Sequence, residues 1–190
     1  MPISTQRLSL PDRLIMAQAA TPRLINIDRD IPASSISMTS QKVIYSGFTP
    51  LATVTASTLS TFVRATAAAT TTLARMGVYT VAADGSITLV ARTASSTTLG
   101  NATFAAAALA LDTTGGYPAS YTFQQGLRYA FAAVWVATTP PALYGSATPT
   151  SANGVLPWLC MSQTGQSALP TSVAIGSLTA ESGLLMMAAY

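Results

Sequence analysis

Residues 73–92 read Leu-Ala-Arg-Met-Gly-Val-Tyr-Thr-Val-Ala-Ala-Asp-Gly-Ser-Ile-Thr-Leu-Val-Ala-Arg. Two runs rich in β-branched, apolar and aromatic residues flank Asp84-Gly85, and Asp-Gly between such runs is a strong hairpin signal. Gly85 can adopt the positive φ of a tight turn at little steric cost. The pattern fits a two-residue loop, Asp84-Gly85, and also a three-residue loop, Ala83-Asp84-Gly85, with a bulge at the glycine. We therefore predict a β-hairpin.

Both faces of this hairpin carry apolar side chains. In the second run, simple alternation places Ile87, Leu89 and Ala91 on one face and Val90 on the other. Because neither face is purely polar, we expect the hairpin to lie inside a layered β structure.

The chain has 190 residues, of which only 8% are charged, against about 25% in an average globular domain. Its mean hydropathy is +0.43. We expect one domain plus an extension, and we expect neighbouring copies to cover apolar surface in a homo-oligomer. The alternative is a well-packed, threonine-rich monomer.

Several partner classes do not fit this composition. The nine basic residues are scattered, whereas binding to nucleic acid normally needs a basic stripe that neutralises several phosphates. Arg7 and Asp12 interrupt the N-terminus before an apolar core of a secretory signal is complete. The best apolar window, Tyr129–Ala137, is about half of the ~20 residues that a membrane helix needs. We expect synthesis in a cytoplasm and no nucleic-acid or membrane partner.

Residues 1–38 differ from the rest and predict an N-terminal arm. The first 42 residues hold eight of the fifteen charged residues. Residues 11–20 fit a short helix that begins at Pro11, and Arg-Leu-Ile occurs at both 13–15 and 23–25. The rest of the arm reads as extended chain that needs another surface to hold it. The residues expected to anchor the arm are Arg13, Leu14, Ile15, Arg23, Leu24, Ile25, Asp28, Arg29 and Asp30.

Residues 39–190 show short β-prone runs between turn signals, with no convincing long helix. The alanine run 105–108 favours helix by propensity, but its neighbours favour strand, and we assign it to a strand. About ten strands without helical crossovers predict an all-β fold, an antiparallel β-sandwich or jelly roll. The expected strands are 41–47, 51–57, 59–66, 73–82, 86–93, 103–111, 119–123, 127–138, 155–161 and 183–189.

The run 127–138 is the clearest core strand. Tyr129, Phe131 and Trp135 share one face, which we expect to line the core between two sheets. The opposite face carries small residues such as Ala130 and Ala132. That face fits a site beneath the arm or against another subunit, and it equally fits a central strand buried on both sides.

Residues suited to catalysis are scarce. The chain has no histidine and one cysteine, Cys160, so the usual base for a nucleophile and the usual zinc ligands are missing. Asp28 and Asp30 flank Arg29, which fits salt bridges to a neighbour better than an acid/base pair or a calcium site. Asp112 fits a loop better than a calcium ligand set. We expect no enzyme activity, no metal and no cofactor.

Aromatic residues near predicted turns leave a binding role open. Tyr117, Tyr144 and Trp158 lie close to glycine or proline, and loops at the ends of a sandwich commonly carry recognition. Exposed rings there would stack on sugars. The alternative is that Tyr117 and Tyr144 close the ends of the sandwich.

Four segments carry a family resemblance: Arg75-Met-Gly-Val-Tyr-Thr-Val81, Asp84-Gly85, Leu89-Val-Ala-Arg-Thr-Ala94 and Gly126-Leu-Arg-Tyr-Ala130. Together they resemble bacteriophage virion proteins of the minor tail protein type, especially those of actinobacteriophages. The resemblance is closest over residues 73–138 and does not include residues 1–38. Leu127 departs from the family pattern, which has a polar residue there.

The resemblance implies a β-sandwich module of a virion and no catalytic residue. We expect a non-enzymatic structural protein of a phage particle, anchored to other capsid or tail proteins through its arm. The alternatives are a tail module that binds a host-surface glycan receptor and a capsid decoration protein.

Overall fold

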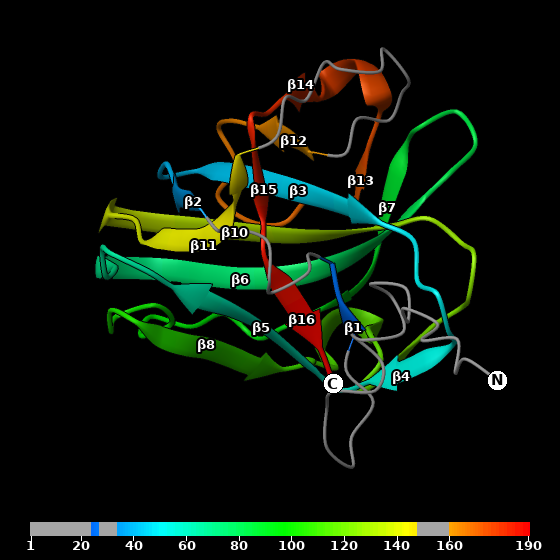
Figure 1. Ribbon diagram of the computed structural model, residues 1–190, viewed down its shortest axis with the longest axis horizontal. Helices are drawn as coiled ribbons and strands as arrows, with labels where there is room; N and C mark the ends of the chain where they lie inside the picture. The colour runs from blue at the N-terminus through cyan, green and yellow to red at the C-terminus, as the bar shows by residue number, and fades with distance from the viewer. Residues whose placement is uncertain (1–23, 27–33, 148–159) are drawn as a thin grey trace, which may run out of the picture.

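The computed structural model describes residues 24–26, 34–147 and 160–190, which form an antiparallel β-sandwich. Sheet A has the strand order β1 (Leu24–Ile25), β16 (Met187–Ala189), β5 (Thr58–Val63), β11 (Ala142–Ala147) and β15 (Gly183–Leu185), with β2 (Ser34–Ser37) on β11 and β8 (Ala105–Ala110) on β5. Sheet B has the order β13 (Ser172–Val173), β7 (Ile87–Arg92), β6 (Ala69–Val81), β10 (Tyr129–Thr139), β3 (Lys42–Phe48), β12 (Cys160–Gln163) and β14 (Thr179–Ala180). In Figure 1 the long strands β3, β10 and β6 lie side by side, and the C-terminus ends close to β1 and β16.

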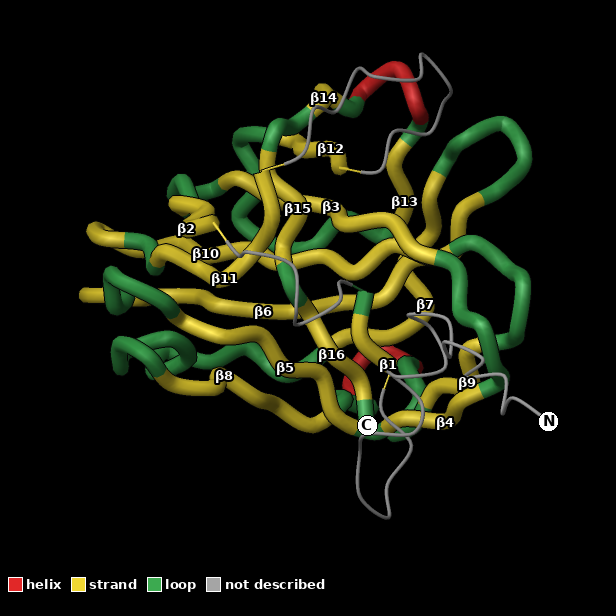
Figure 2. The backbone as a smooth tube through the Cα atoms, viewed as in Figure 1, coloured by secondary structure: helices red, strands yellow, loops and turns green. Residues whose placement is uncertain are grey.

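Helix is limited to two single turns in the described part of the chain, η1 (Thr114–Gly116) and η2 (Ile175–Ser177), as Figure 2 shows. A two-stranded ribbon of β4 (Val54–Ala56) and β9 (Tyr121–Phe123) completes the fold. The described residues include no helix long and apolar enough to cross a membrane. The predicted all-β sandwich is confirmed.

The core between the sheets is built on the aromatic face of β10. Tyr129, Phe131 and Trp135 belong to it, as predicted, together with residues of sheet A such as Leu59 and Leu143. The indole Nε1 of Trp135 donates to the carbonyl of Leu99 at 3.0 Å, so this buried ring leaves no polar atom unsatisfied.

A second core lies on the other face of sheet B. Ala130 and Ala132 of β10 are fully buried there, and Leu169 and Val173 pack in the same cluster. The chain's own C-terminal residues therefore cover this face. Of the two possibilities, the central strand buried on both sides is the one observed.

The hairpin of β6 and β7 has the three-residue loop. The N–H of Gly85 donates to the carbonyl of Ala82 at 3.0 Å, and the N–H of Ala82 donates to the carbonyl of Ser86 at 2.9 Å. Gly85 has φ +84°, and Asp84 Oδ1 accepts hydrogen bonds from the N–H and hydroxyl of Ser86 at 2.9 and 2.7 Å.

The predicted alternation along the second run is wrong at Ala91. The register of β6 with β7 shifts between Val78 and Tyr79. After this bulge, Ala91 points into the core between the sheets, whereas Ile87 and Leu89 lie in the second core. A bulge places two residues opposite one and so reverses the faces beyond it.

The long strands of the structure lie at the residue ranges expected from the sequence, whereas several short strands do not. The alanine run lies in β8, as predicted. The expected strand 183–189 is divided at Met186, whose N–H donates to the carbonyl of Tyr144 at 2.9 Å. Strands β1, β2, β11, β13 and β14 were not predicted. Of the expected strand 155–161, only its last two residues are described, in β12.

Candidate functional site

The end of the predicted arm is part of sheet A. Leu24 pairs with Ala189 and Ile25 with Ala188, both in β16. The neighbouring strand in sheet A on the other side of β16 is β5. This segment therefore reaches the sandwich as an edge strand.

Asn26 fixes this attachment, although no local sequence pattern indicates such a role. Its Nδ2 donates to the carbonyl of Leu185 at 2.8 Å, and its Oδ1 accepts the N–H of Met187 at 2.8 Å. One amide side chain thus satisfies backbone groups on both sides of the break at Met186, where the strand pairing changes. Seven predicted anchoring residues lie outside the described residues: Arg13, Leu14, Ile15, Arg23, Asp28, Arg29 and Asp30.

The part of the outer face of sheet A formed by β1, β16, β5 and β8 carries mostly small, uncharged residues. A row of paired residues runs across four strands from Ile25 through Ala188 and Ser60 to Ala108. Beside it, a pocket of about 220 Å³ is lined by Ile25, Phe62 and Met186, among others. Along this row the face offers shape and apolar contact but no ionic group.

Strand β8 has an edge that no other described strand covers. Thr58 and Tyr190 exchange two backbone hydrogen bonds on the side of β5 that faces away from β8. Because hydrogen-bonded pairs alternate along an antiparallel ladder, Ala106 and Ala108 direct their N–H and C=O groups away from β5. A pocket of about 200 Å³ lies beside this edge, between β8 and residues 96–102.

The predicted aromatic residues do not form one site. Tyr144 lies in β11 rather than in a loop, with its ring 5.6 Å from that of Phe62 and 5.2 Å from the guanidinium of Arg64. Tyr117 packs on the second core, on the other sheet. Trp158 lies outside the described residues.

Tyr117 instead belongs to a cationic cluster on the outer face of sheet B. Its ring centroid lies 4.6 Å from the guanidinium carbon of Arg92. Arg92 also donates from Nη2 to the carbonyl of Thr114 at 3.2 Å. Arg75 lies nearby on β6, and burial, followed by the charge of Arg92, lowers its pKa. Sequence reasoning identified Tyr117 but gave no role to the two arginines.

Asp112 lies beside this cluster and is held by its own turn. Its carboxylate accepts hydrogen bonds from the N–H of Thr114 at 3.0 Å and from the Thr114 hydroxyl. These hydrogen bonds lower the pKa of Asp112. The described residues include no cluster of three side chains suited to hold a metal ion.

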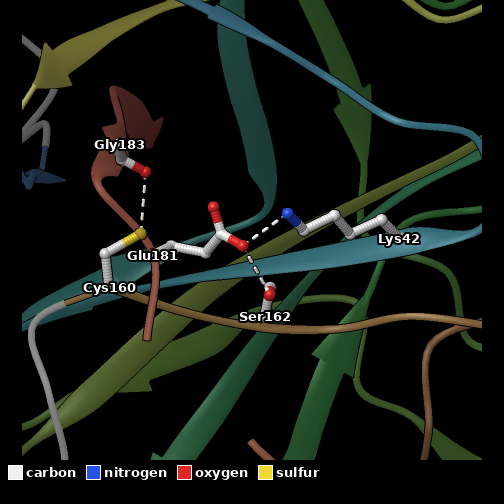
Figure 3. A network of polar contacts seen from close by, with 5 residues as sticks. All are labelled: Lys42, Cys160, Ser162, Glu181 and Gly183. Atoms are coloured by element: carbon white, nitrogen blue, oxygen red, sulfur yellow. Dashed lines mark hydrogen bonds and ion pairs between the residues drawn. The ribbon is translucent and has the colours of Figure 1, made fainter. Parts of the chain in front are cut away.

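A second group of polar contacts lies around β3 and β12 of sheet B and reaches β15 of sheet A (Figure 3). Lys42 forms an ion pair with Glu181, whose Oε1 also accepts the hydroxyl of Ser162 at 2.7 Å. The thiol of Cys160 donates to the carbonyl of Gly183 at 2.7 Å. Burial, with a smaller contribution from Glu181, raises the pKa of Cys160 to about 12. The raised pKa keeps Cys160 as the neutral thiol rather than the nucleophilic thiolate.

No protein-family model matches the chain, and no curated protein is significantly similar to it in sequence.

Proposed function

We propose that this protein is a non-enzymatic structural protein of a bacteriophage particle, which attaches to other virion proteins through its N-terminal arm and associates with copies of itself. The observation that carries the proposal is the edge strand β1. Pairing of Leu24 and Ile25 with β16, and the two hydrogen bonds of Asn26, tie the arm to the sandwich. Residues before Leu24 are then the part that meets a partner.

Two surface features support association with other proteins. The row of paired residues on the outer face of sheet A has no charge, and β8 presents backbone hydrogen-bonding groups without a charged or proline residue to block them. Soluble proteins usually protect such edges. A virion protein meets its neighbours at high local concentration, where exposed edges become interfaces.

A truncation tests the arm. Removing residues 1–22 leaves β1 and Asn26 in place, so the sandwich keeps its edge strand. We expect the truncated protein to fold but to be missing from purified particles, whereas the full chain is incorporated. Incorporation of both forms to the same extent would contradict anchoring by the arm.

Gold-labelled antibodies on intact particles test the virion assignment itself. Label over the head would support capsid decoration, and label at one end of the tail would support a minor tail role. An absence of label from all particles would contradict the virion proposal.

A host-surface binding role is the second candidate function. It is favoured by the cationic cluster of Arg75, Arg92 and Tyr117, which is unusual on a chain with so few charges.

A further inference from the structure

Arg75 and Arg92 lie on adjacent strands and on the same face of sheet B. Arg92 of β7 pairs with Gly77 of β6, and Arg75 precedes Gly77 by two residues. Residues in such a diagonal relationship have Cα atoms about 7–8 Å apart, within reach of each other for long side chains. The bulge in β7 creates this arrangement, because it turns Arg92 to the face that Gly77 shares with Arg75.

The position of Arg92 is fixed by three groups. The ring of Tyr117 lies against its guanidinium, and the carbonyl of Thr114 accepts its Nη2. Gly115, with φ +77°, allows the η1 turn to lie close to the Arg92 guanidinium, since a Cβ at this position would lie 3.2 Å from Nη2 of Arg92. A guanidinium held in this way is oriented before any ligand arrives.

The two positive charges have no ion-pair partner in the described part of the chain. The ion pair found there joins Lys42 and Glu181. The charge of Asp112 acts on both arginines, but its carboxylate oxygens are bonded to Thr114 and form no ion pair with either arginine. The Nε atoms of Arg75 and Arg92 are buried and have no hydrogen-bond partner among the described residues. Two adjacent guanidinium groups repel each other unless an anion lies between them.

We propose that Arg75 and Arg92 bind the oxyanion of a ligand that carries phosphate or carboxylate groups. Guanidinium groups present several N–H donors in a planar fork, which matches two oxygens of a phosphate or carboxylate. Tyr117 has the positioning role: one side of its ring contacts Arg92, and the residue packs on the second core. This inference is independent of whether the protein belongs to a virion.

The test uses the full-length protein labelled with ¹⁵N and follows the arginine Nε–Hε resonances. Inorganic phosphate and acetate are added separately at constant ionic strength, with chloride as the reference anion. We expect saturable shifts of the Arg75 and Arg92 resonances. Saturation by phosphate assigns a phosphoryl ligand, and saturation by acetate alone assigns a carboxylate ligand. Shifts that do not saturate with either anion would overturn the proposal.

Arg75→Gln is the main variant, because the described residues make no hydrogen bond with this side chain. We expect it to weaken anion binding about tenfold, the effect of losing one charge-assisted contact. Arg128→Gln removes the same charge elsewhere and is the matched control. Equal weakening by both variants would show a general charge effect and overturn the site.

Asp112→Asn tests whether the two arginines bind an anion or only stabilise the fold. Asparagine keeps one oxygen to accept the N–H of Thr114, but the nearby negative charge is gone. We expect tighter anion binding by a protein that still folds, with at most a small loss of thermal stability from the second Thr114 hydrogen bond. Weaker binding in this variant would contradict an oxyanion site.

Discussion

The hydroxyl of Tyr79 donates a hydrogen bond to the carbonyl of Pro170 at 2.7 Å. Two residues earlier on the same face of β6, Gly77 leaves the space that Leu169 fills, because a Cβ there would lie 2.7 Å from Cδ1 of Leu169. These adjacent contacts hold the C-terminal segment over sheet B. The glycine and tyrosine of the Arg75-x-Gly-x-Tyr79 pattern therefore have a packing explanation.

We expect Tyr79→Phe to lower the free energy of unfolding by about 1–2 kcal/mol, since it leaves the Pro170 carbonyl without its partner. Tyr45 is the matched control. It is equally buried and its ring meets that of Tyr79 edge to face at 5.2 Å, but its hydroxyl has no hydrogen-bond partner in the described chain. Tyr45→Phe should be neutral or slightly stabilising. Urea unfolding of both variants measures the difference, and equal losses would contradict this assignment.

Alkaline pH should unfold the protein through its buried tyrosines. Burial raises the pKa values of Tyr45 and Tyr79 above the ordinary value for tyrosine. The fold therefore favours their neutral forms. Their contribution to the free energy of unfolding is fully present below the unfolded-state pKa of about 10 and is lost as pH rises above it. We expect the urea midpoint to fall steadily above about pH 10. Absorbance at 295 nm should show delayed ionisation of these two tyrosines and of Tyr121, whose pKa burial raises to about 12. An ordinary titration of all seven tyrosines would contradict the prediction.

Cys160 should react with a thiol reagent only when the protein opens. Its side chain is fully buried, and the pKa raised to about 12 leaves almost no thiolate at neutral pH. We expect negligible reaction with 5,5′-dithiobis(2-nitrobenzoate) in buffer and complete reaction in urea. Rapid reaction of the native protein at pH 8 would show that β12 is accessible.

Gly145 is a position where any side chain should be costly. A Cβ there would lie 2.3 Å from the carbonyl oxygen of Leu184 and 2.7 Å from Ile36, and the backbone cannot move without breaking the pairing of β11 with β15. We expect Gly145→Ala to cost about 2–3 kcal/mol, at the upper end of overpacking effects. Gly176→Ala, which meets nothing within 4 Å, is the control and should change stability by less than about 1 kcal/mol. Similar thermal stability of the two variants would contradict the packing at β11.

The sequence predicted the parts of the fold that depend on local pattern. The Asp84-Gly85 turn, the aromatic face of β10 and the strand at the alanine run follow from turn chemistry and alternation. Strands of two residues such as β13 have too few positions to show alternation. The position of Ala91 depends on a bulge, which is a property of the pairing rather than of either strand alone.

The cationic cluster could not be predicted from the sequence because it too depends on strand pairing. Arg75 and Arg92 are seventeen positions apart, and only the register of β6 with β7 brings them together. Alternation without the bulge would have turned Arg92 to the opposite face. Tyr117 was identifiable from its glycine neighbours, but its contact with Arg92 was not. Asn26 had no local signal, because its partners lie about 160 residues away, at Leu185 and Met187.

Self-association should depend on the edge of β8. An added strand would pair with the outward N–H and C=O groups of Ala106 and Ala108, and the neutral alanines of two copies would meet without charge repulsion. We expect Ala108→Lys to shift the protein towards monomer in sedimentation velocity, because lysine on an edge strand disfavours strand addition. Ala83→Lys adds the same charge at the exposed hairpin loop and is the control, which should leave association unchanged. If both variants associate like the original chain, the copies meet through a surface that does not include Ala108, and the outer face of sheet A around Phe62 becomes the next to test, by Phe62→Lys.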